Sequence, residues 1–579
     1  MHGGELVARV LKKHGVPYLF TLCGGHISPI LTACKRNKIR VIDVRHEVNA
    51  VFAADAVSRL TGIPGVAAVT AGPGLTNTIT AVKNAELAQS PLVLLGGATA
   101  TILRGRGSLQ DIDQMKLMRP HVKRAIRVKR VRDIVPALTS AFEKAVSGVP
   151  GPVFVELPID LLYEESLVRE WYLGKNPGGG NWRTRLMNAY LGRHLNRIFR
   201  RAELFHDPAA IPEPMMPRIP QFESTHVEKV AAALAESQRP LLLIGSQAML
   251  NPTRVSELRQ AVEKLGIPVY LAGMARGLLG QDHALQMRHK RRDALREADL
   301  VILAGLPCDF RLDYGRHIKA HTQHIAINRS SEDLTRNKRP HIKVAGDPGA
   351  FLISLSAAQS APPDRSAWSQ KLRDLNTLRE QEIAATARQK TKFSNPVRAC
   401  QEIEAALDKG SVLVADGGDF VGTAAYIVQP RQPLSWLDPG LFGTLGVGAG
   451  FALGAKLVNP KADIWILYGD GSCAYSLAEF DTFARHNLPV IAVVGNDGAW
   501  SQIAREQVEI LKDDVGTVLN LTDYHKVAEG YGGKGLLVKS ERELNTALKQ
   551  ARKTARSGKA VLVNILIGKT DFRKGSLSM

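Results

Sequence analysis

The sequence predicts an α/β protein with three doubly wound parallel-sheet domains in series. Its 579 residues exceed what one hydrophobic core usually organises. The 45% hydrophobic and 23% charged fractions are typical of folded globular proteins. Short apolar runs alternate with helical stretches in three successive blocks, and this alternation is typical of parallel sheets covered by helices.

The first block defines a domain over residues 1–165. Helical stretches separate its apolar runs, which cover residues 17–22, 39–44, 65–71, 90–97 and 151–157. Several of these runs end in glycine-rich loops such as TLCGGH and TAGPGLTN. Because ligands of open α/β sheets bind at the carboxyl ends of the strands, we expect these loops to line a site.

Two further α/β blocks define the central and last domains, residues 228–360 and 395–579. The central block has apolar runs at residues 239–245, 267–273, 298–305 and 324–328. The last has them at residues 411–418, 462–471, 488–497 and 560–568, ending in small or acidic residues. A linker over 361–394 separates these blocks, polar and proline-containing at first and helical after.

Residues 166–227 form a basic insertion between the first two domains. Its segment WRTRLMNAYLGRHLNRIFRR, residues 182–201, has apolar residues at helical spacing and six flanking arginines. The spacing predicts a basic amphipathic helix. Such a helix either packs on its own protein or lies on an anionic membrane surface, and the sequence leaves both interpretations open.

The charge balance and the cysteines limit the function classes. Lys and Arg exceed Asp and Glu by 76 to 55, a net charge of +21, which favours anionic partners such as phosphorylated cofactors or acidic membranes. Five scattered cysteines without metal-ligand spacing argue against zinc and favour a reducing compartment. The amino-terminal residues read as a charged amphipathic helix, not a signal peptide. The Gly-rich run 439–455 is too short for a membrane span, so we expect no transmembrane helix.

The stretch ILYGDGS, residues 466–472, predicts a metal-linked phosphate site. Gly-Asp-Gly after an apolar strand brings the backbone close to a phosphate and leaves Asp470 free to bind a cation. An ordinary turn is the alternative, because Gly and Asp are usual turn residues. A helical stretch and a second strand follow, ending in Asn496-Asp497. One helix therefore separates two groups of oxygen donors, the spacing of a βαβ unit that holds a hard cation at a diphosphate.

The Gly-Asp-Gly motif and the following Asn-containing pair resemble the thiamine-diphosphate signature. RHEVNAVFAADAVSRLTG, residues 45–62, resembles the RHE helix of the acetolactate-synthase superfamily, and LFGTLGVGAGFALGAK, residues 441–456, resembles its cofactor loop. The resemblance covers almost the whole chain apart from the insertion. It implies pyrimidine-binding, central nucleotide-binding-like and diphosphate-binding domains, with thiamine diphosphate and Mg²⁺ as cofactors.

The resemblance also implies site residues. Glu47 would hydrogen-bond a ring nitrogen of the aminopyrimidine and act as the catalytic acid–base. The Gly443 carbonyl would face the exocyclic amine, and Leu445 would lie between the two cofactor rings. Gln110 would contact the substrate hydroxyl or carbonyl, with a surface glutamine as the alternative. The residues implied at the diphosphate or the metal are Asp470, Gly471, Ser472, Asn496, Asp497 and Ala499.

Two positions depart from the family pattern. The usual Asn-Asn pair is Asn-Asp here, and counting 27 positions from Asp470 leads to Asp497. Either residue of the pair is a candidate metal ligand, and we favour Asp497 with the Ala499 carbonyl as a third donor. In the central domain Asn328 and Arg329 replace a ribose-binding aspartate, which weakens the case for FAD. Arg329 and Arg311 are candidates for coenzyme A phosphates or solvated surface charges.

The resemblance is strongest to the animal acetolactate synthase-like proteins, which act as 2-hydroxyacyl-CoA lyases. It implies cleavage of a 2-hydroxyacyl-CoA to formyl-CoA and an aldehyde shortened by one carbon, as in fatty-acid alpha-oxidation. The motifs leave open an acetolactate synthase or other 2-oxoacid carboligase, and a non-catalytic membrane-associated scaffold. We expect a homodimer or homotetramer, an acyl-CoA substrate and no nucleic-acid partner. Location at the endoplasmic reticulum membrane is also implied, without an anchor in this chain and therefore peripheral or cytoplasm-facing.

Overall fold

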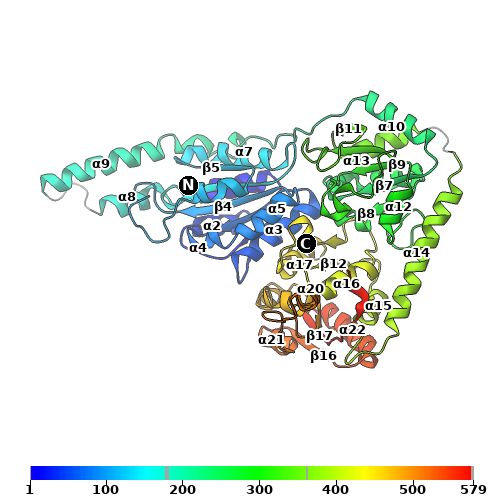
Figure 1. Cartoon of the computed structure of the whole chain (residues 1–579). Coiled ribbons are helices and arrows are strands. Elements are labelled where there is room, and N and C mark those ends of the chain that lie inside the picture. Colours follow the sequence, from blue (N-terminus) through cyan, green and yellow to red (C-terminus); the bar gives the residue numbers. More distant parts are fainter. Residues whose placement is uncertain (1, 176–180, 360–362, 576–579) are drawn as a thin grey trace. The chain divides into compact units, whose positions relative to one another are not determined.

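The computed structural model describes residues 2–175, 181–359 and 363–575 of the chain (Figure 1). Three parallel sheets follow one another along the sequence, each with helices between its strands, so the predicted fold class is confirmed. The chain divides into two compact units, one of residues 1–58 and 63–218, the other of residues 59–62 and 219–579. The first unit contains the first sheet and the basic insertion up to residue 218, and the second contains the other two sheets.

The first sheet has six strands in the order β2-β1-β3-β4-β6-β5, all parallel. Its strands are β1 (Tyr18–Thr21), β2 (Arg40–Asp43), β3 (Gly65–Val69), β4 (Leu92–Ala98), β5 (Arg124–Arg127) and β6 (Pro152–Pro158). The helices of this unit are α1 (Gly3–Lys13), α2 (Ser28–Arg36), α3 (Glu47–Thr61), α4 (Pro73–Thr76), α5 (Ile79–Leu87), α6 (Gln114–Met118), α7 (Ile134–Val146), α8 (Glu165–Leu173) and α9 (Trp182–Phe199). The central strands β3, β4 and β6 are buried along their whole length, which explains their unbroken apolar sequences.

The second sheet has five parallel strands in the order β11-β10-β9-β7-β8. Its strands are β7 (Pro240–Ile244), β8 (Val269–Leu271), β9 (Leu300–Ala304), β10 (Gln323–Asn328) and β11 (Ile342–Ala345). Around it lie α10 (Ser224–Glu236), α11 (Val255–Leu265), α12 (Arg291–Glu297) and α13 (Pro348–Ala358). Asp347 caps α13 by accepting a hydrogen bond from the Ala350 amide at 2.7 Å, and Pro348 occupies the first helical position. The long helix α14 (Ser366–Ala387) then leads to the third sheet.

The third sheet has six parallel strands in the order β13-β12-β14-β15-β17-β16. Its strands are β12 (Val412–Ala415), β13 (Trp436–Leu437), β14 (Ile464–Gly469), β15 (Ile491–Asn496), β16 (Lys534–Val538) and β17 (Val561–Leu566). Its helices are α15 (Pro396–Ala406), α16 (Asp419–Ile427), α17 (Val447–Val458), α18 (Asp470–Ala474), α19 (Glu479–Arg485), α20 (Ser501–Leu511), α21 (Tyr524–Gly530) and α22 (Glu541–Arg556). The winding order of this sheet repeats that of the first.

The basic insertion contains α8 and α9, and α9 matches the predicted amphipathic helix. Its carboxyl-terminal residues Leu195, Ile198 and Phe199 are buried in the apolar core of the first unit. Its amino-terminal half is different, because Trp182 and Leu186 are 69% and 66% exposed. In Figure 1 this half extends past the sheet of its own unit. The interpretation as a self-packed helix is therefore confirmed for the second half of α9 only.

No helix in the described part of the chain is both long enough and apolar enough to cross a bilayer. The Gly-rich run 439–455 instead forms a turn and the first three quarters of α17, a buried helix that packs against β12 and β14 of the third sheet.

Candidate active site

A pocket lies at the carboxyl ends of β12 and β14, where the winding of the third sheet reverses direction. Such reversal points are where open α/β sheets bind ligands, because the loops after the two neighbouring strands run to opposite faces and leave a crevice. The loops that follow β12, β14 and β15 all contribute to its wall. The lining residues include Gly418, Asp419, Asp470, Gly471, Ser472, Asp497, Ala499 and Trp500.

Asp470 is the first residue of α18, so Gly-Asp-Gly joins a strand directly to a helix. Its carboxylate accepts hydrogen bonds from the Gly471 amide at 2.7 Å and from the Ala499 amide at 3.1 Å. The two glycines permit close packing: a Cβ at Gly471 would lie 2.4 Å from the Trp500 ring, and one at Gly469 would lie 3.0 Å from the Gly417 carbonyl. The motif therefore does more than reverse the chain, since it fixes one carboxylate against the pocket.

Asp470 and Asp497 place two acids in the same pocket wall. Burial, and next the negative charge of Asp497, raises the pKa of Asp470 to about 6. Burial also raises the pKa of Asp497, although the Ser501 hydroxyl donates a hydrogen bond to it. Two partly desolvated carboxylates repel each other when both are ionised. A divalent cation between them would remove this penalty, and carboxylate oxygens are the ligands that Mg²⁺ prefers.

Asn496, which directly precedes Asp497, ends β15 and is fully buried. Its side-chain amide donates hydrogen bonds to the Thr522 carbonyl at 3.0 Å and to the Asn564 side-chain oxygen at 3.2 Å. These bonds fix the orientation of the amide group. The Asn496 Oδ1 atom has no hydrogen-bond partner among the described residues, which is unusual for a buried oxygen.

The predicted cofactor loop lies beside this pocket. Gly443 adopts φ +62°, and the Leu445 side chain is close enough to Gly417 that a Cβ there would come within 2.3 Å of it. Asp416, directly after β12, accepts hydrogen bonds from the Gly446 amide at 2.9 Å and the Gly448 amide at 2.6 Å. Burial raises the pKa of Asp416 to about 7. One buried carboxylate therefore fixes the loop that carries Leu445.

Ser472 lies in the pocket wall with its hydroxyl turned toward the backbone. The hydroxyl is within hydrogen-bond distance of the Gly417 and Gly469 carbonyls, at 3.0 and 3.1 Å. Its hydrogen is therefore shared between these carbonyls, which links the loop after β12 to the end of β14.

In the first unit, Glu47 opens α3 and is only 7% exposed. Its carboxylate accepts a hydrogen bond from the Asn77 side chain at 3.0 Å. The loop after β3 lies against it, because a Cβ at Gly74 would come within 3.6 Å of the Glu47 Oε1 atom. Glu47 is thus a buried acid held by one amide at the glycine-rich loop that the sequence singles out.

Gln110 lies over the same loop of the first unit. It adopts φ +63°, and a Cβ at Gly72 would come within 2.8 Å of its carbonyl oxygen. A second glutamine, Gln114, is buried beneath it, accepting from the Gly72 amide at 3.2 Å and donating to the Gly97 carbonyl at 3.0 Å. Gln110 is therefore half-buried at the surface of this loop, whereas Gln114 is buried and holds the loop in place.

Family models match three parts of the chain. The N-terminal TPP binding domain of thiamine pyrophosphate enzymes matches residues 1–117, the central domain of these enzymes matches 227–355, and their C-terminal TPP binding domain matches 416–565. The chain belongs to the thiamine pyrophosphate enzyme family. Thiamine diphosphate is accordingly its cofactor, and the pocket at β12 and β14 lies within the C-terminal binding domain.

Relatives of this thiamine pyrophosphate enzyme match over nearly its full length. The 2-hydroxyacyl-CoA lyase 2 of Danio rerio is 52% identical over 585 residues, spanning 100% of this chain and 93% of the relative. The 2-hydroxyacyl-CoA lyase 2 of Homo sapiens is 51% identical, spanning 100% and 92%. The probable acetolactate synthase of Mycobacterium bovis is 35% identical, spanning 98% and 96%.

The residues of this thiamine pyrophosphate enzyme fit its cofactor. The two acids of the pocket and the Ala499 carbonyl could supply oxygen donors for a hard cation, as could the Asn496 oxygen that has no partner among the described residues. In the described residues no three His, Cys, Asp or Glu side chains cluster as a metal site. A cation here would thus need further oxygens, which a diphosphate provides.

The sequence interpretation missed several residues around the cofactor pocket. Asp416 follows an apolar strand and precedes two glycines, and this is the same signal that drew attention to Asp470. Asn77 follows a Gly-Pro-Gly loop and shows no signal of its own before the fold is known. Other missed residues of the pocket wall include Asp419, Trp500 and Ser501.

In the central domain the two candidate arginines already have partners. Arg329 pairs with Asp347 at 2.5 Å, and its side chain is 4% exposed. Arg311 pairs with Asp309 at 2.5 Å. Each guanidinium is therefore neutralised locally, which removes the support for either arginine as a coenzyme A phosphate ligand.

Proposed function

We propose that the chain is a thiamine-diphosphate-dependent lyase that cleaves 2-hydroxyacyl-CoA to formyl-CoA and an aldehyde shortened by one carbon. The observation that carries this proposal is the 51–53% identity, over the whole chain, to several proteins named 2-hydroxyacyl-CoA lyase 2. The acetolactate synthases match at 35%, which makes carboligation of 2-oxoacids the second candidate. The two acids that line the cofactor pocket, Asp470 and Asp497, argue against a non-catalytic scaffold.

The reaction breaks the bond between C1 and C2 of the substrate. The hydroxyl proton leaves as C2 becomes the aldehyde, and C1 gains a proton to become the formyl thioester. Thiamine diphosphate, when bound, supplies the carbon nucleophile and the electron sink for this cleavage. The protein must therefore orient the cofactor, hold the substrate and move protons.

Glu47 is the residue that we propose for proton transfer at the aminopyrimidine ring of the cofactor. It is buried, it belongs to the N-terminal TPP binding domain, and one oxygen is committed to Asn77. The other oxygen remains for a ring nitrogen. In the same unit Gln110 is the proposed contact of the substrate hydroxyl or carbonyl, because it lies at the surface of the adjacent glycine loop.

In the C-terminal TPP binding domain, we assign Leu445 to the space between the two cofactor rings and the Gly443 carbonyl to the exocyclic amine. Gly471 and Ser472 line the pocket where backbone approaches the diphosphate. A bulky apolar side chain between the rings would hold them at an angle, and this V-shape would bring the amine toward the reactive carbon. Asp416 supports this arrangement by holding the loop at two amides.

For Mg²⁺ we propose Asp470, Asp497 and the Ala499 carbonyl as protein ligands, because all three residues line the pocket. Asn496 is the alternative to Asp497, supported by its unpaired buried oxygen. Calorimetric titration of thiamine diphosphate with Mg²⁺ separates them. Asp470→Ala and Asp497→Ala should lose Mg²⁺-dependent binding, whereas Asn496→Ala should retain it. Full affinity in Asp497→Ala with a loss in Asn496→Ala would reverse the assignment.

Product analysis tests the reaction itself. The protein, loaded with thiamine diphosphate and Mg²⁺, is incubated with a long-chain 2-hydroxyacyl-CoA and separately with pyruvate. Formyl-CoA and the shortened aldehyde support the lyase. Acetolactate from pyruvate would select the carboligase, and cofactor binding without either product would contradict both enzymes.

We further propose that the protein works at the surface of the endoplasmic reticulum membrane and contacts anionic lipid through the amino-terminal half of α9. Trp182, Leu186, Met187 and Tyr190 are each more than half exposed there. An exposed apolar group of this size is unusual unless it meets another surface. All six arginines of residues 182–201 are exposed as well, and each near an anionic bilayer contributes about 1 kcal/mol.

Vesicle co-sedimentation tests this contact. A triple change of Trp182, Leu186 and Tyr190 to Ser should reduce pelleting with anionic vesicles, whereas neutral vesicles should pellet neither protein. Phe199 is left intact because it is 7% exposed and packs in the core. The matched control changes exposed apolar residues elsewhere, Met216, Tyr314 and Leu378, to Ser. Equal pelleting of all three proteins would contradict the proposal. If the triple variant sediments more slowly than the wild type in the absence of vesicles, the exposed surface is instead a contact between subunits.

A further inference from the structure

The helix α16 begins at the cofactor pocket and ends against arginines that come from the central domain. Gly418 and Asp419, at its amino-terminal end, line the pocket. Asp419 also accepts a hydrogen bond from Arg505 of α20, so this end is tied to the rest of the pocket wall. The position of the pocket wall therefore depends on where α16 lies.

The carboxyl-terminal end of α16 has no cap of its own. Its last turn has no Lys, Arg or His, and Val428 after it is extended, where many helices have a left-handed glycine. The last four carbonyls of a helix need partners from outside the helix. The Val428 amide supplies the first of these by donating to the Ala424 carbonyl at 2.8 Å.

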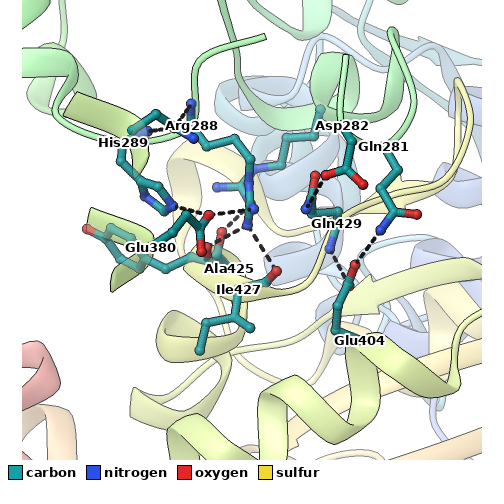
Figure 2. A network of polar contacts seen from close by, with 12 residues as sticks. Gln281, Asp282, Arg288, His289, Glu380, Glu404, Ala425, Ile427 and Gln429 are labelled. Atoms are coloured by element: carbon teal, nitrogen blue, oxygen red, sulfur yellow. Dashed lines mark hydrogen bonds and ion pairs between the residues drawn. The ribbon is translucent and has the colours of Figure 1, made fainter. Parts of the chain in front are cut away.

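Two arginines donate hydrogen bonds to the remaining three carbonyls of α16, and Figure 2 shows those of Arg288. Arg276 donates to the Ala425 carbonyl at 2.9 Å. Arg288 donates to the Tyr426 carbonyl at 2.6 Å and to the Ile427 carbonyl at 2.9 Å. Every terminal carbonyl of α16 is thus satisfied, and both external donors are positive charges at the negative end of the helix dipole.

Both arginines are themselves held in place. The Arg288 guanidinium donates to Glu380 of α14 at 3.0 Å, and Glu380 also hydrogen-bonds the His289 ring at 2.9 Å (Figure 2). The Arg288 and His289 amides donate to the same Asn376 side chain. Arg276 lies over the Trp436 ring, 4.6 Å from its centroid. Burial lowers the pKa of both guanidinium groups, yet arginine stays charged at neutral pH, so these desolvated charges require their partners.

We infer that Arg276 and Arg288 are positioning residues for the diphosphate pocket, which they hold in place through α16 without touching the cofactor. None of the described residues that line the pocket comes from the central domain, so this contact gives that domain a part in cofactor binding. The inference rests on the cofactor assignment and is independent of the substrate. Loss of either arginine leaves terminal carbonyls of α16 unpaired, and the amino-terminal turn becomes free to shift.

The test uses full-length Arg276→Met and Arg288→Met proteins, which keep most of the side-chain length. Each should raise the dissociation constant for thiamine diphosphate, measured by calorimetry at saturating Mg²⁺, by about tenfold. Amide hydrogen exchange of residues 419–427 should be faster than in the wild type before cofactor is added. Arg288→Lys, which keeps the positive charge and a hydrogen-bond-donating group, should recover part of the affinity. Arg336→Met is the matched control, since Arg336 belongs to the same domain, is 41% exposed and pairs with Glu332 and Asp333.

A purely structural role would lower the melting temperature without changing the affinity of the folded protein. Wild-type affinity and exchange in both Met variants would therefore overturn the inference. If neither variant folds, Glu380→Gln replaces them, because it leaves both arginines in place and loosens Arg288. Wild-type affinity and exchange in that protein would then overturn it. Failure of the wild type to bind thiamine diphosphate would contradict the cofactor assignment instead.

Discussion

Glu47 is buried, and its carboxylate accepts a hydrogen bond from the Asn77 side chain. Replacing it by Gln keeps the shape and the hydrogen-bonding reach but removes the acid that transfers a proton. We expect Glu47→Gln to fold and bind the cofactor, and to lose roughly 100-fold or more in proton exchange at the reactive carbon of thiamine diphosphate. Exchange is followed by NMR after acid quench. Glu86→Gln, at a half-exposed ion pair with Lys83, is the control. Unchanged exchange in Glu47→Gln would contradict the role.

Asp470 makes the stability of the cofactor-free protein depend on pH. Its pKa is raised from 3.8 to about 6. Between these values the unfolded chain releases the proton while the folded protein retains it, so this group destabilises the fold progressively as pH rises through the window. In EDTA, Asp470→Asn should therefore gain stability relative to the wild type from pH 4 to pH 7, by up to about 3 kcal/mol.

Urea unfolding at both pH values measures this difference. Asp374→Asn, at an exposed site on α14, should show no comparable trend. Addition of Mg²⁺ with thiamine diphosphate at pH 7 should stabilise the wild type more than the variant, because the cation offsets the repulsion between Asp470 and Asp497. A difference that stays constant with pH would contradict the prediction.

At the scale of single residues, motif spacing was sufficient to find the pocket acids. Asp470 and Asp497 lie together in one wall although 27 positions separate them. Spacing alone did not resolve Asn496 from Asp497, because neighbouring residues at a strand end point in opposite directions and the sequence does not show which faces the pocket. Asp416 also precedes glycines after a strand, but its partners are the backbone amides of Gly446 and Gly448, and the sequence does not show which amides a carboxylate meets.

At the scale of elements, the strands that the apolar pattern missed are all at sheet edges. They are β5, β11, β13 and β16, each at the end of its sheet. An edge strand pairs on one side only and tolerates charged residues, so RAIR and IKVA lack the unbroken apolar run of a central strand. The buried central strands were predicted because both of their faces are covered by helices.

The loop that carries Leu445 is held by the side chain of Asp416, directly after β12. Asp416→Ala would leave the buried Gly446 and Gly448 amides without their acceptor, so we expect a loss of about 2 kcal/mol or more in the free energy of unfolding. The affinity for thiamine diphosphate should fall with it. Urea unfolding and calorimetry measure the two effects. Asp374→Ala on the exposed face of α14 should change stability by less than about 0.5 kcal/mol. Equal stability of Asp416→Ala and the wild type would exclude this role.

At the scale of the whole molecule, the two TPP binding domains lie at opposite ends of the sequence. The family resemblance implies that a site combines them from two chains. Glu47→Gln and Asp470→Ala, each inactive, are co-expressed with different tags and the mixed dimer is purified. If the site is shared, one intact site forms, and the mixed dimer should have about half of the wild-type activity.

The reciprocal experiment pairs the Glu47→Gln, Asp470→Ala double variant with a wild-type chain. A shared site then has one altered residue in each copy, and the mixed dimer should be inactive. Half activity in this control, with none in the first mixture, would place the complete site within one chain. Sedimentation of fully active protein as a monomer would have the same consequence.

The first and third sheets wind in the same order, second strand, first, third, fourth, sixth, fifth. In each sheet this winding places a reversal point between the first and third strands. In the first sheet the helix after the second strand begins with the buried Glu47, and in the third sheet the helix after the third strand begins with Asp470 between two glycines. One winding thus carries two different acids at two different loops, so the chemistry of each sheet depends on its loops and not on its topology.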